Sequence, residues 1–263
     1  MKKYLQIFKI SFKESRSTYI NAMMSVISFG IIIFIFFHLW QYLFANNINT
    51  TISGYSFQQM IWYLITAEMI AFSMSGRHLV NGINSDIRSG KISYMLNKPF
   101  HYYLFCIFNN MGEVVFKLIL ILFIFIPFGI LLVGIPFTKI LTIFPIAFSL
   151  LLSGFLASAL YSLVGLMAFW TEDANPFYWI ISKLTLLFGV FFPPELFPDV
   201  IKNIIVYSPI YSIYSGTAKL MANFEWELFF TVTISQILYI ALFIGFGLLI
   251  YKKGIKKVNI NGG

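Results

Sequence analysis

The sequence predicts an all-α integral membrane protein with six transmembrane helices, folded as a single domain over residues 1–263. Three observations support this fold class: the hydropathy of the chain, the positions of its basic residues and the positions of its tryptophans. Of the 263 residues, 59% are hydrophobic and 11% are charged, whereas a soluble domain has roughly 25% charged residues. A soluble fold of this length could not bury so much apolar surface, so we expect lipid to surround part of the chain.

Six segments are candidates for transmembrane helices. A helix needs about 20 mainly apolar residues to cross the hydrocarbon core of a bilayer. The second candidate is the weakest, because it contains Gln58, Gln59 and Glu68. The predicted spans are residues 20–43, 57–74, 114–133, 140–169, 177–192 and 229–251.

The basic residues predict the orientation of these spans. Most of them fall before the first span, between the second and third, or after the sixth, and six spans place all three groups on one side. An excess of Lys and Arg marks the cytoplasmic side, so we expect a multi-pass protein of the bacterial cell (plasma) membrane with both termini cytoplasmic. Only Lys139, Lys202 and Lys219 are expected on the other side. The three groups are Lys2, Lys3, Lys9, Lys13 and Arg16; Arg77, Arg88, Lys91 and Lys98; and Lys252, Lys253, Lys256 and Lys257.

The tryptophans support the same spans. All five lie near predicted span ends, where an indole ring can keep one edge in water and the other in apolar surroundings. They are Trp40, Trp62, Trp170, Trp179 and Trp226.

Residues 1–18 form an amphipathic segment. Leu5, Phe8 and Phe12 share one helical face, and Lys9 and Lys13 lie elsewhere. This pattern favours an interfacial helix on the inner membrane surface over a solvated basic tail.

The sequence lacks the residue patterns that several other functions would require. The net charge of +8 is explained by topology, and no basic face with interleaved aromatics indicates nucleic-acid binding. The histidines His38, His78 and His101 do not have metal-ligand spacing, and Cys106 is the single cysteine. We therefore predict no metal site and no catalytic residues. The chain also has no P-loop, so we expect it to bind no nucleotide cofactor itself.

The predicted cytoplasmic loop over residues 76–100 is the most informative segment. Ile83, Ile87, Tyr94 and Leu96 interrupt its polar residues at intervals compatible with short helices, and Gly90 is placed to end one of them. From the residues alone, the loop could either dock a soluble partner or form an ordered loop without one.

Two motifs resemble a known transporter family. Residues 86–92, DIRSGKI, followed by LNKP at 96–99, resemble the acidic–x–Arg–x–Gly … Leu–x–x–Pro signature of ABC-2 type permeases, the membrane subunits of ABC exporters. Residues 191–198, FFPPELFP, and 207–210, YSPI, resemble the stretch that enters an outer re-entrant hairpin in that family. Asp86 stands where many members have Glu.

The resemblance implies a specific mode of action. The loop would carry a coupling helix that sits in a cleft of a separate ATPase subunit, with Asp86, Arg88, Ser89, Gly90 and Lys91 contacting or positioning that partner. Residues 1–18 would be the connecting helix, and residues 193–228 would be the re-entrant segment. The working unit would pair two permease chains, identical or paralogous, with two ATPase chains, which hold the ATP and Mg.

Four ionisable residues fall within or beside the predicted spans, where charge is costly. Glu113 and Lys117 have i, i+4 spacing and either form a functional pair or snorkel at the interface. Glu68 and Lys183 either line a pathway or, for Lys183, reach the headgroups.

Two other readings compete with the permease. A stand-alone secondary transporter or channel would show inverted repeats or ionisable groups at mid-span, and a membrane-embedded enzyme would show a clustered set of catalytic residues. The sequence shows no convincing repeat, few mid-span charges and scattered histidines, so it favours the permease.

Overall fold

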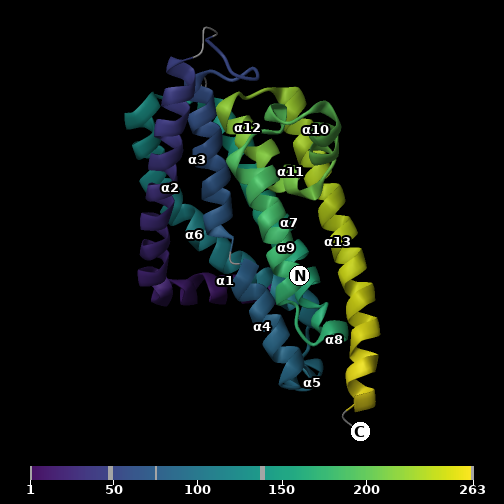
Figure 1. Cartoon of the computed structure of the whole chain (residues 1–263). Coiled ribbons are helices and arrows are strands. Elements are labelled where there is room, and N and C mark those ends of the chain that lie inside the picture. Colours follow the sequence, from purple (N-terminus) through teal and green to yellow (C-terminus); the bar gives the residue numbers. More distant parts are fainter. Residues whose placement is uncertain (1, 47–49, 75, 137–139, 262–263) are drawn as a thin grey trace.

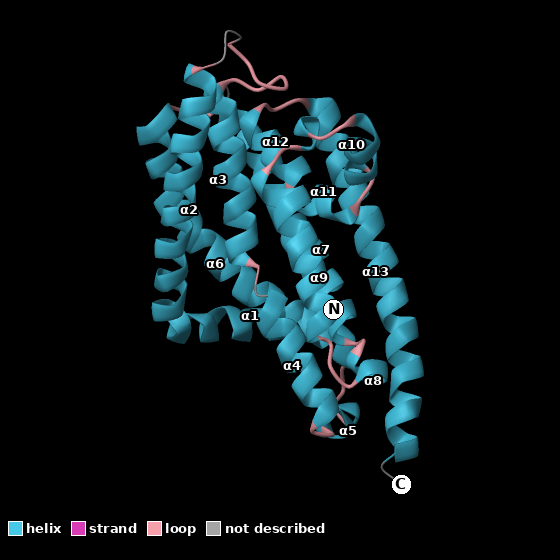
Figure 2. Ribbon diagram, viewed as in Figure 1, coloured by secondary structure: helices cyan, strands magenta, loops and turns pink. Residues whose placement is uncertain are grey.

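The chain folds into a bundle of helices joined by short loops (Figure 1, Figure 2). A computed structural model describes residues 2–46, 50–74, 76–136 and 140–261; the predicted outer Lys139 and the first residue of the N-terminal segment lie outside them. The prediction of an all-helical protein is confirmed for the described residues.

The longer helices make up the body of the bundle. They are α1 (Lys2–Glu14), α2 (Tyr19–Ala45), α3 (Phe57–Ser73), α4 (Gly76–Arg88), α6 (Tyr102–Val133), α7 (Ile143–Gly165), α9 (Asn175–Thr185) and α13 (Trp226–Asn261).

Shorter helical segments connect and cover the longer ones. They are α5 (Lys91–Leu96), α8 (Ala168–Thr171), α10 (Asp199–Val206), α11 (Pro209–Ile213) and α12 (Ser215–Ala222), together with the 3-10 turns η1 (Ser15–Thr18), η2 (Ile140–Thr142) and η4 (Pro194–Leu196) and the π-helical segment η3 (Leu186–Phe191).

Four helical segments in the described residues are long and apolar enough to cross a membrane. They are Val26–Ala45, Tyr102–Val133, Ile143–Thr171 and Trp226–Lys257. Two other predicted spans correspond to shorter segments, because α3 has 17 residues and α9 with η3 has 11 and 6.

Two helices extend well beyond the predicted spans. The third span was expected to begin at residue 114, but α6 begins at Tyr102 because its first turns pack against other helices: Tyr102, Tyr103 and Asn110 are all buried. At the other end of the chain, α13 continues through the lysines at 252–257, which are good helix formers.

The N-terminal helix packs against α6. The Ser11 hydroxyl donates to the Asn109 carbonyl at 2.6 Å, and the Tyr4 and Phe108 rings stack at 5.3 Å. Lys9 and Lys13 are exposed. The helix predicted within residues 1–18 is therefore present, and its position on a membrane surface stays a prediction.

The segment predicted as a re-entrant hairpin, residues 193–228, folds as η4, α10, α11 and α12 at one end of the bundle (Figure 1). Helix α12 lies deepest, with Gly216, Ala218 and Leu220 buried. Lys219 pairs with Glu195 at 2.6 Å, and the Tyr55 hydroxyl donates to the same carboxylate at 3.1 Å. These contacts join the short helices to the loop before α3.

A buried polar cluster fixes α12 against the longer helices. The Gln236 side-chain nitrogen on α13 lies 3.0 Å from Ser153 Oγ, 3.1 Å from Thr217 Oγ1 and 2.9 Å from the Ser212 carbonyl oxygen, and its two N–H groups are shared among these acceptors. Ser149 and Ser153 on α7 are each within 3.0 Å of the Thr217 hydroxyl. We call these five residues the Gln236 cluster. Polar groups removed from water require such partners.

The close contact between α1 and α6 depends on Gly112. A Cβ at this position would lie 2.6 Å from the Phe8 carbonyl oxygen and 2.7 Å from the Phe12 nitrogen, so the variant Gly112→Ala must push the two backbones apart. We expect Gly112→Ala to destabilise the purified protein by about 1–3 kcal/mol in thermal unfolding. Gly245→Ala on α13 is the matched control, because a Cβ there meets no atom within 4 Å. Equal melting temperatures for the two variants would contradict the contact.

Candidate functional site

The predicted coupling loop forms two helices joined by a tight turn. Helix α4 ends at Arg88, and Gly90 has φ +73° before α5 begins at Lys91. This left-handed conformation favours glycine, and the prediction that Gly90 ends a helix is confirmed. The Ser89 hydroxyl donates to the Ser85 carbonyl at 2.7 Å. The turn and α5 lie at the end of the bundle opposite α10–α12 (Figure 1).

The apolar side of α4 is held against α7. Leu79, Val80 and Ile83 are buried, and a Cβ at Gly165 would lie 2.9 Å from the Ile83 side chain. Small residues allow helices to approach this closely. The base of the α4–α5 segment is therefore packed into the bundle.

Asp86 joins α4, α5 and α6. Its carboxylate accepts a hydrogen bond from the Tyr102 hydroxyl at 2.8 Å and pairs with Lys91 Nζ at 2.9 Å. The side chain is about four fifths buried. Asp86 and Lys91 are thus brought together across the turn, and Asp86 is placed to position the turn.

The tip of the segment is exposed. Arg88, Ser89, Gly90 and Lys91 all face solvent, and Ile92 is buried beneath them. Four of the five predicted partner-contacting residues therefore form one surface, to which we add α5 and call it the coupling tip (residues 88–96).

The second face of α5 carries a tyrosine that the motif did not include. Tyr94 is 60% exposed, and Lys98 Nζ lies 2.8 Å from its hydroxyl. The Lys98 ammonium lowers the pKa of this phenol through that hydrogen bond. Tyr94 extends the polar and aromatic surface of the coupling tip.

A second connection links α4 to the start of α9. Asn84 Nδ2 donates to Asp173 Oδ1 at 2.9 Å, and the Asn175 backbone N–H donates to the same oxygen at 3.0 Å. The hydrogen bond from the Asn175 backbone lowers the pKa of the Asp173 carboxyl, and the Asn175 and Asn84 side chains add to this effect. These hydrogen bonds make Asp173 an internal tether between α4 and the start of α9.

Aromatic rings connect the same region to α13. Tyr102 and Tyr251 stack with ring centroids 5.9 Å apart, and Phe169 contacts Tyr251 at 6.3 Å. The base of the segment is thus linked to α6, α7, α9 and α13. The sequence did not single out Tyr102 or Asn84, because both lie outside the signature and the partner of Asn84 is 89 residues away in the chain.

Glu113 and Lys117 form the predicted i, i+4 pair, with Nζ and Oε1 2.8 Å apart. Glu113 also faces His78 Nδ1 of α4 at 3.4 Å. The hydrogen bond with this carboxylate raises the pKa of His78. A small cavity of about 110 Å³ lies beside this pair between α4 and α6.

Glu68 and Lys183 lie on α3 and α9, outside the coupling tip. Glu68 is buried within α3, and its Oε1 has no hydrogen-bond partner among the described residues. Lys183 is exposed on α9, with Nζ 5.2 Å from the centre of the Trp179 ring. Arg77 lies 5.7 Å from the same ring, which is a cation–π arrangement.

No group of three or more His, Cys, Asp or Glu side chains that could hold a metal occurs within the described ranges, and Cys106 is buried.

Comparison with known proteins identifies a family. Residues 19–262 match the family described as ABC-2 family transporter protein. A search of curated proteins found no match. The matched family consists of multi-pass transporter membrane domains that carry no ATPase domain.

The Asp86–Tyr102 hydrogen bond should determine how rigid the coupling tip is. The variant Tyr102→Phe removes the donor and leaves a largely buried carboxylate with Lys91 alone, so we expect a loss of about 1–2 kcal/mol and faster hydrogen exchange over residues 86–96. Tyr94→Phe removes an exposed hydroxyl from the same segment and serves as the control. If exchange in Tyr102→Phe matched that of Tyr94→Phe, the hydrogen bond would not hold the turn.

Proposed function

Because the chain belongs to the ABC-2 family of transporter proteins, we propose that it is the permease subunit of an ATP-driven exporter. Membership of this family implies an ATPase partner. In the proposed complex, two permease chains form the translocation pathway and two ATPase chains bind the ATP and Mg. The present chain contributes the membrane helices and the surface through which the ATPase acts.

One observation supports this assignment above the others: the coupling tip is exposed while its base is buried. Arg88, Lys91 and Tyr94 offer two positive charges and an aromatic ring to a partner. Aromatic and Arg side chains are enriched at protein interfaces. An ordered loop without a partner would not need such a surface to be tied so firmly to four helices.

The contacts at the base would carry movement from the tip to the membrane helices. Asp86 contacts the first residue of α6, Asn84 contacts the turn before α9, and Ile83 touches α7 at Gly165. A packed core transmits displacement because it has low compressibility. A shift of α4 would therefore act on three membrane helices at once, which suits a coupling element better than a passive connector.

We further propose six spans, with α3 and the α9–η3 segment added to the four long helices. Both segments are slightly short for a bilayer, but they lie among other helices; most of α3 is buried. With six spans, α1, the coupling tip and the end of α13 lie in the cytoplasm, and α10–α12 lie on the outer side as a re-entrant segment. Non-helical backbone is tolerated at membrane depth where protein covers it.

The intramembrane charges are assigned by their surroundings. We propose that Glu113 and Lys117 form a neutral pair at the interface, where they fix α6 to α4, and that Lys183 reaches the headgroups beside Trp179. Glu68 is the remaining pathway candidate, because its carboxyl is buried without a partner for Oε1. A Glu68→Gln variant with an undiminished transport rate would remove it from the pathway.

The topology predicts which positions can be labelled from each side. In a Cys106→Ser background, we expect Tyr207→Cys to react with a membrane-impermeant maleimide in intact cells and Tyr94→Cys to react only after permeabilisation. Both side chains are well exposed, at 81% and 60%, so access to the reagent decides the result. Labelling of both positions from the same side would contradict six spans.

The coupling role predicts the effect of charge reversal at the tip. The measurement is the amount of ATPase subunit that co-purifies with the tagged full chain from its native membranes. We expect the double variant Arg88→Glu/Lys91→Glu to recover roughly tenfold less of it than the wild type, or less still, because like-charge contacts cost several kcal/mol. Lys9→Glu, an exposed charge reversal on α1, is the control and should retain the partner. A tagged wild-type chain that purifies alone and transports without ATP would refute the permease assignment itself.

A further inference from the structure

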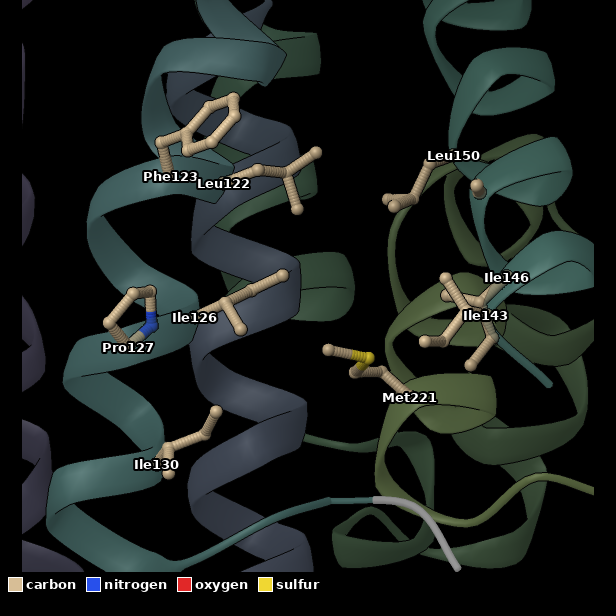
Figure 3. Close-up of a pocket in the computed structure, with 10 residues that line it drawn as sticks. Leu122, Phe123, Ile126, Pro127, Ile130, Ile143, Ile146, Leu150 and Met221 are labelled. Atoms are coloured by element: carbon tan, nitrogen blue, oxygen red, sulfur yellow. The ribbon is translucent and has the colours of Figure 1, made fainter. Parts of the chain in front are cut away.

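An apolar groove separates α6 from α7 near the α10–α12 end. Its cavity volume is about 470 Å³ and all ten residues that line it are apolar, which is within the ~300–1,000 Å³ range of small-molecule sites. Figure 3 shows Leu122, Ile126 and Ile130 on α6 across from Ile143 and Ile146 on α7, with Met221 of α12 between the two helices.

The groove opens sideways from the bundle. Phe123, Ile130 and Ile143 at its rim are 78%, 40% and 43% exposed, respectively, while Ile146 and Leu150 inside it are buried. In a multi-pass membrane protein, such an opening faces either lipid chains or another protein. An alkyl chain could therefore enter it directly from the hydrocarbon core.

A polar mouth lies at the α10–α12 end of this groove. This second cavity has a volume of about 560 Å³. Thr142 and Ala222 line the mouth, and their neighbours in sequence, Ile143 and Met221, line the groove, so the two cavities lie next to each other at the start of α7 and the end of α12. Trp62 donates from Nε1 to the Gly134 carbonyl at 3.0 Å, which joins α3 to the end of α6 beside the mouth.

Among the described residues that line the mouth, the charged ones are both acidic. Glu225 and Glu227 line it, and no described Lys or Arg does. Neither glutamate forms a salt bridge with another described residue; the Glu225 carboxylate accepts a neutral hydrogen bond from the Asn223 side chain at 2.9 Å. Trp226 stands between them, 56% exposed, with Phe224 at 5.1 Å. Carboxylates and exposed aromatic faces together attract ammonium groups.

We propose that the groove and its mouth form one binding site for a single-chain cationic amphiphile. The alkyl chain would lie between α6 and α7 against Ile126 and Ile146, and the ammonium headgroup would lie among Glu225, Trp226 and Glu227. Burial of each methylene stabilises the alkyl chain in the groove relative to water, but membrane lipid competes for the groove. The headgroup contacts therefore decide which amphiphile is held. This site does not depend on the coupling mechanism or on the number of spans.

The test uses photo-labelling of the full chain in phosphatidylglycerol nanodiscs. The probes are an alkyltrimethylammonium and an alkyl sulfate of equal chain length, each with a diazirine in the chain, and mass spectrometry locates the adducts. We expect the ammonium probe to label residues 122–130 and 143–150 saturably, and excess unmodified alkyltrimethylammonium to prevent this labelling.

The double variant Glu225→Gln/Glu227→Gln should weaken saturable labelling by about three- to tenfold, as expected for two exposed charges. Both side chains are exposed, so the variant should fold normally. Glu172→Gln, an exposed acid at the opposite end of the bundle, is the control and should label as the wild type does. Because all variants share one bilayer composition, probe partitioning is equal among them.

Three results would overturn the proposal. Equal groove labelling by the sulfate and ammonium probes, or labelling insensitive to the glutamate variant, would make the groove a general lipid contact. Adducts spread evenly over α2 and α13 would show no site. Cross-linking of the groove to a second copy of the chain, with no probe adduct, would make it a protein interface.

Discussion

The structure depends on one constraint: helices that cross lipid must satisfy their polar groups within the protein. The Gln236 cluster meets this constraint at the α10–α12 end. A single amide reaches two hydroxyls and a carbonyl on three other helical segments, which fixes α12 between α7 and α13. Helix α12 can then lie deep in the bundle with its Thr217 hydroxyl partnered, and it forms part of the boundary of the groove and its mouth.

The same constraint has a different outcome at the other end of the bundle. Here Asp86 and Asn84 find partners at the base of α4, while the polar groups of the coupling tip face solvent. The division between a satisfied base and a solvated tip gives the segment both rigidity and a free surface. A coupling element requires both, since a loose base would lose movement and a buried tip could meet no partner.

The sequence predicted those features that depend on local pattern. Hydropathy located the long helices, and glycine chemistry placed the end of α4 at Gly90. The local pattern could not predict contacts between residues that are distant in the sequence. Asn84 and Asp173 are 89 residues apart in the chain, and their hydrogen bond follows from the packing of α4 on α7. The early start of α6 was missed because Tyr102 and Asn110 are polar yet buried, so hydropathy excluded them. The groove was also unpredictable, since its apolar lining looks the same in sequence as a lipid-facing surface.

The central claim is that the coupling tip contacts an ATPase subunit. It is tested most directly by a photo-cross-linking amino acid placed at Tyr94 in the tip and, as the control, at Tyr207 beside α10, since both side chains are well exposed. In native membranes, the account predicts an adduct between position 94 and a separate chain that carries a P-loop, and no such adduct at position 207. An absence of ATPase adducts at position 94, or their equal formation at position 207, would contradict it.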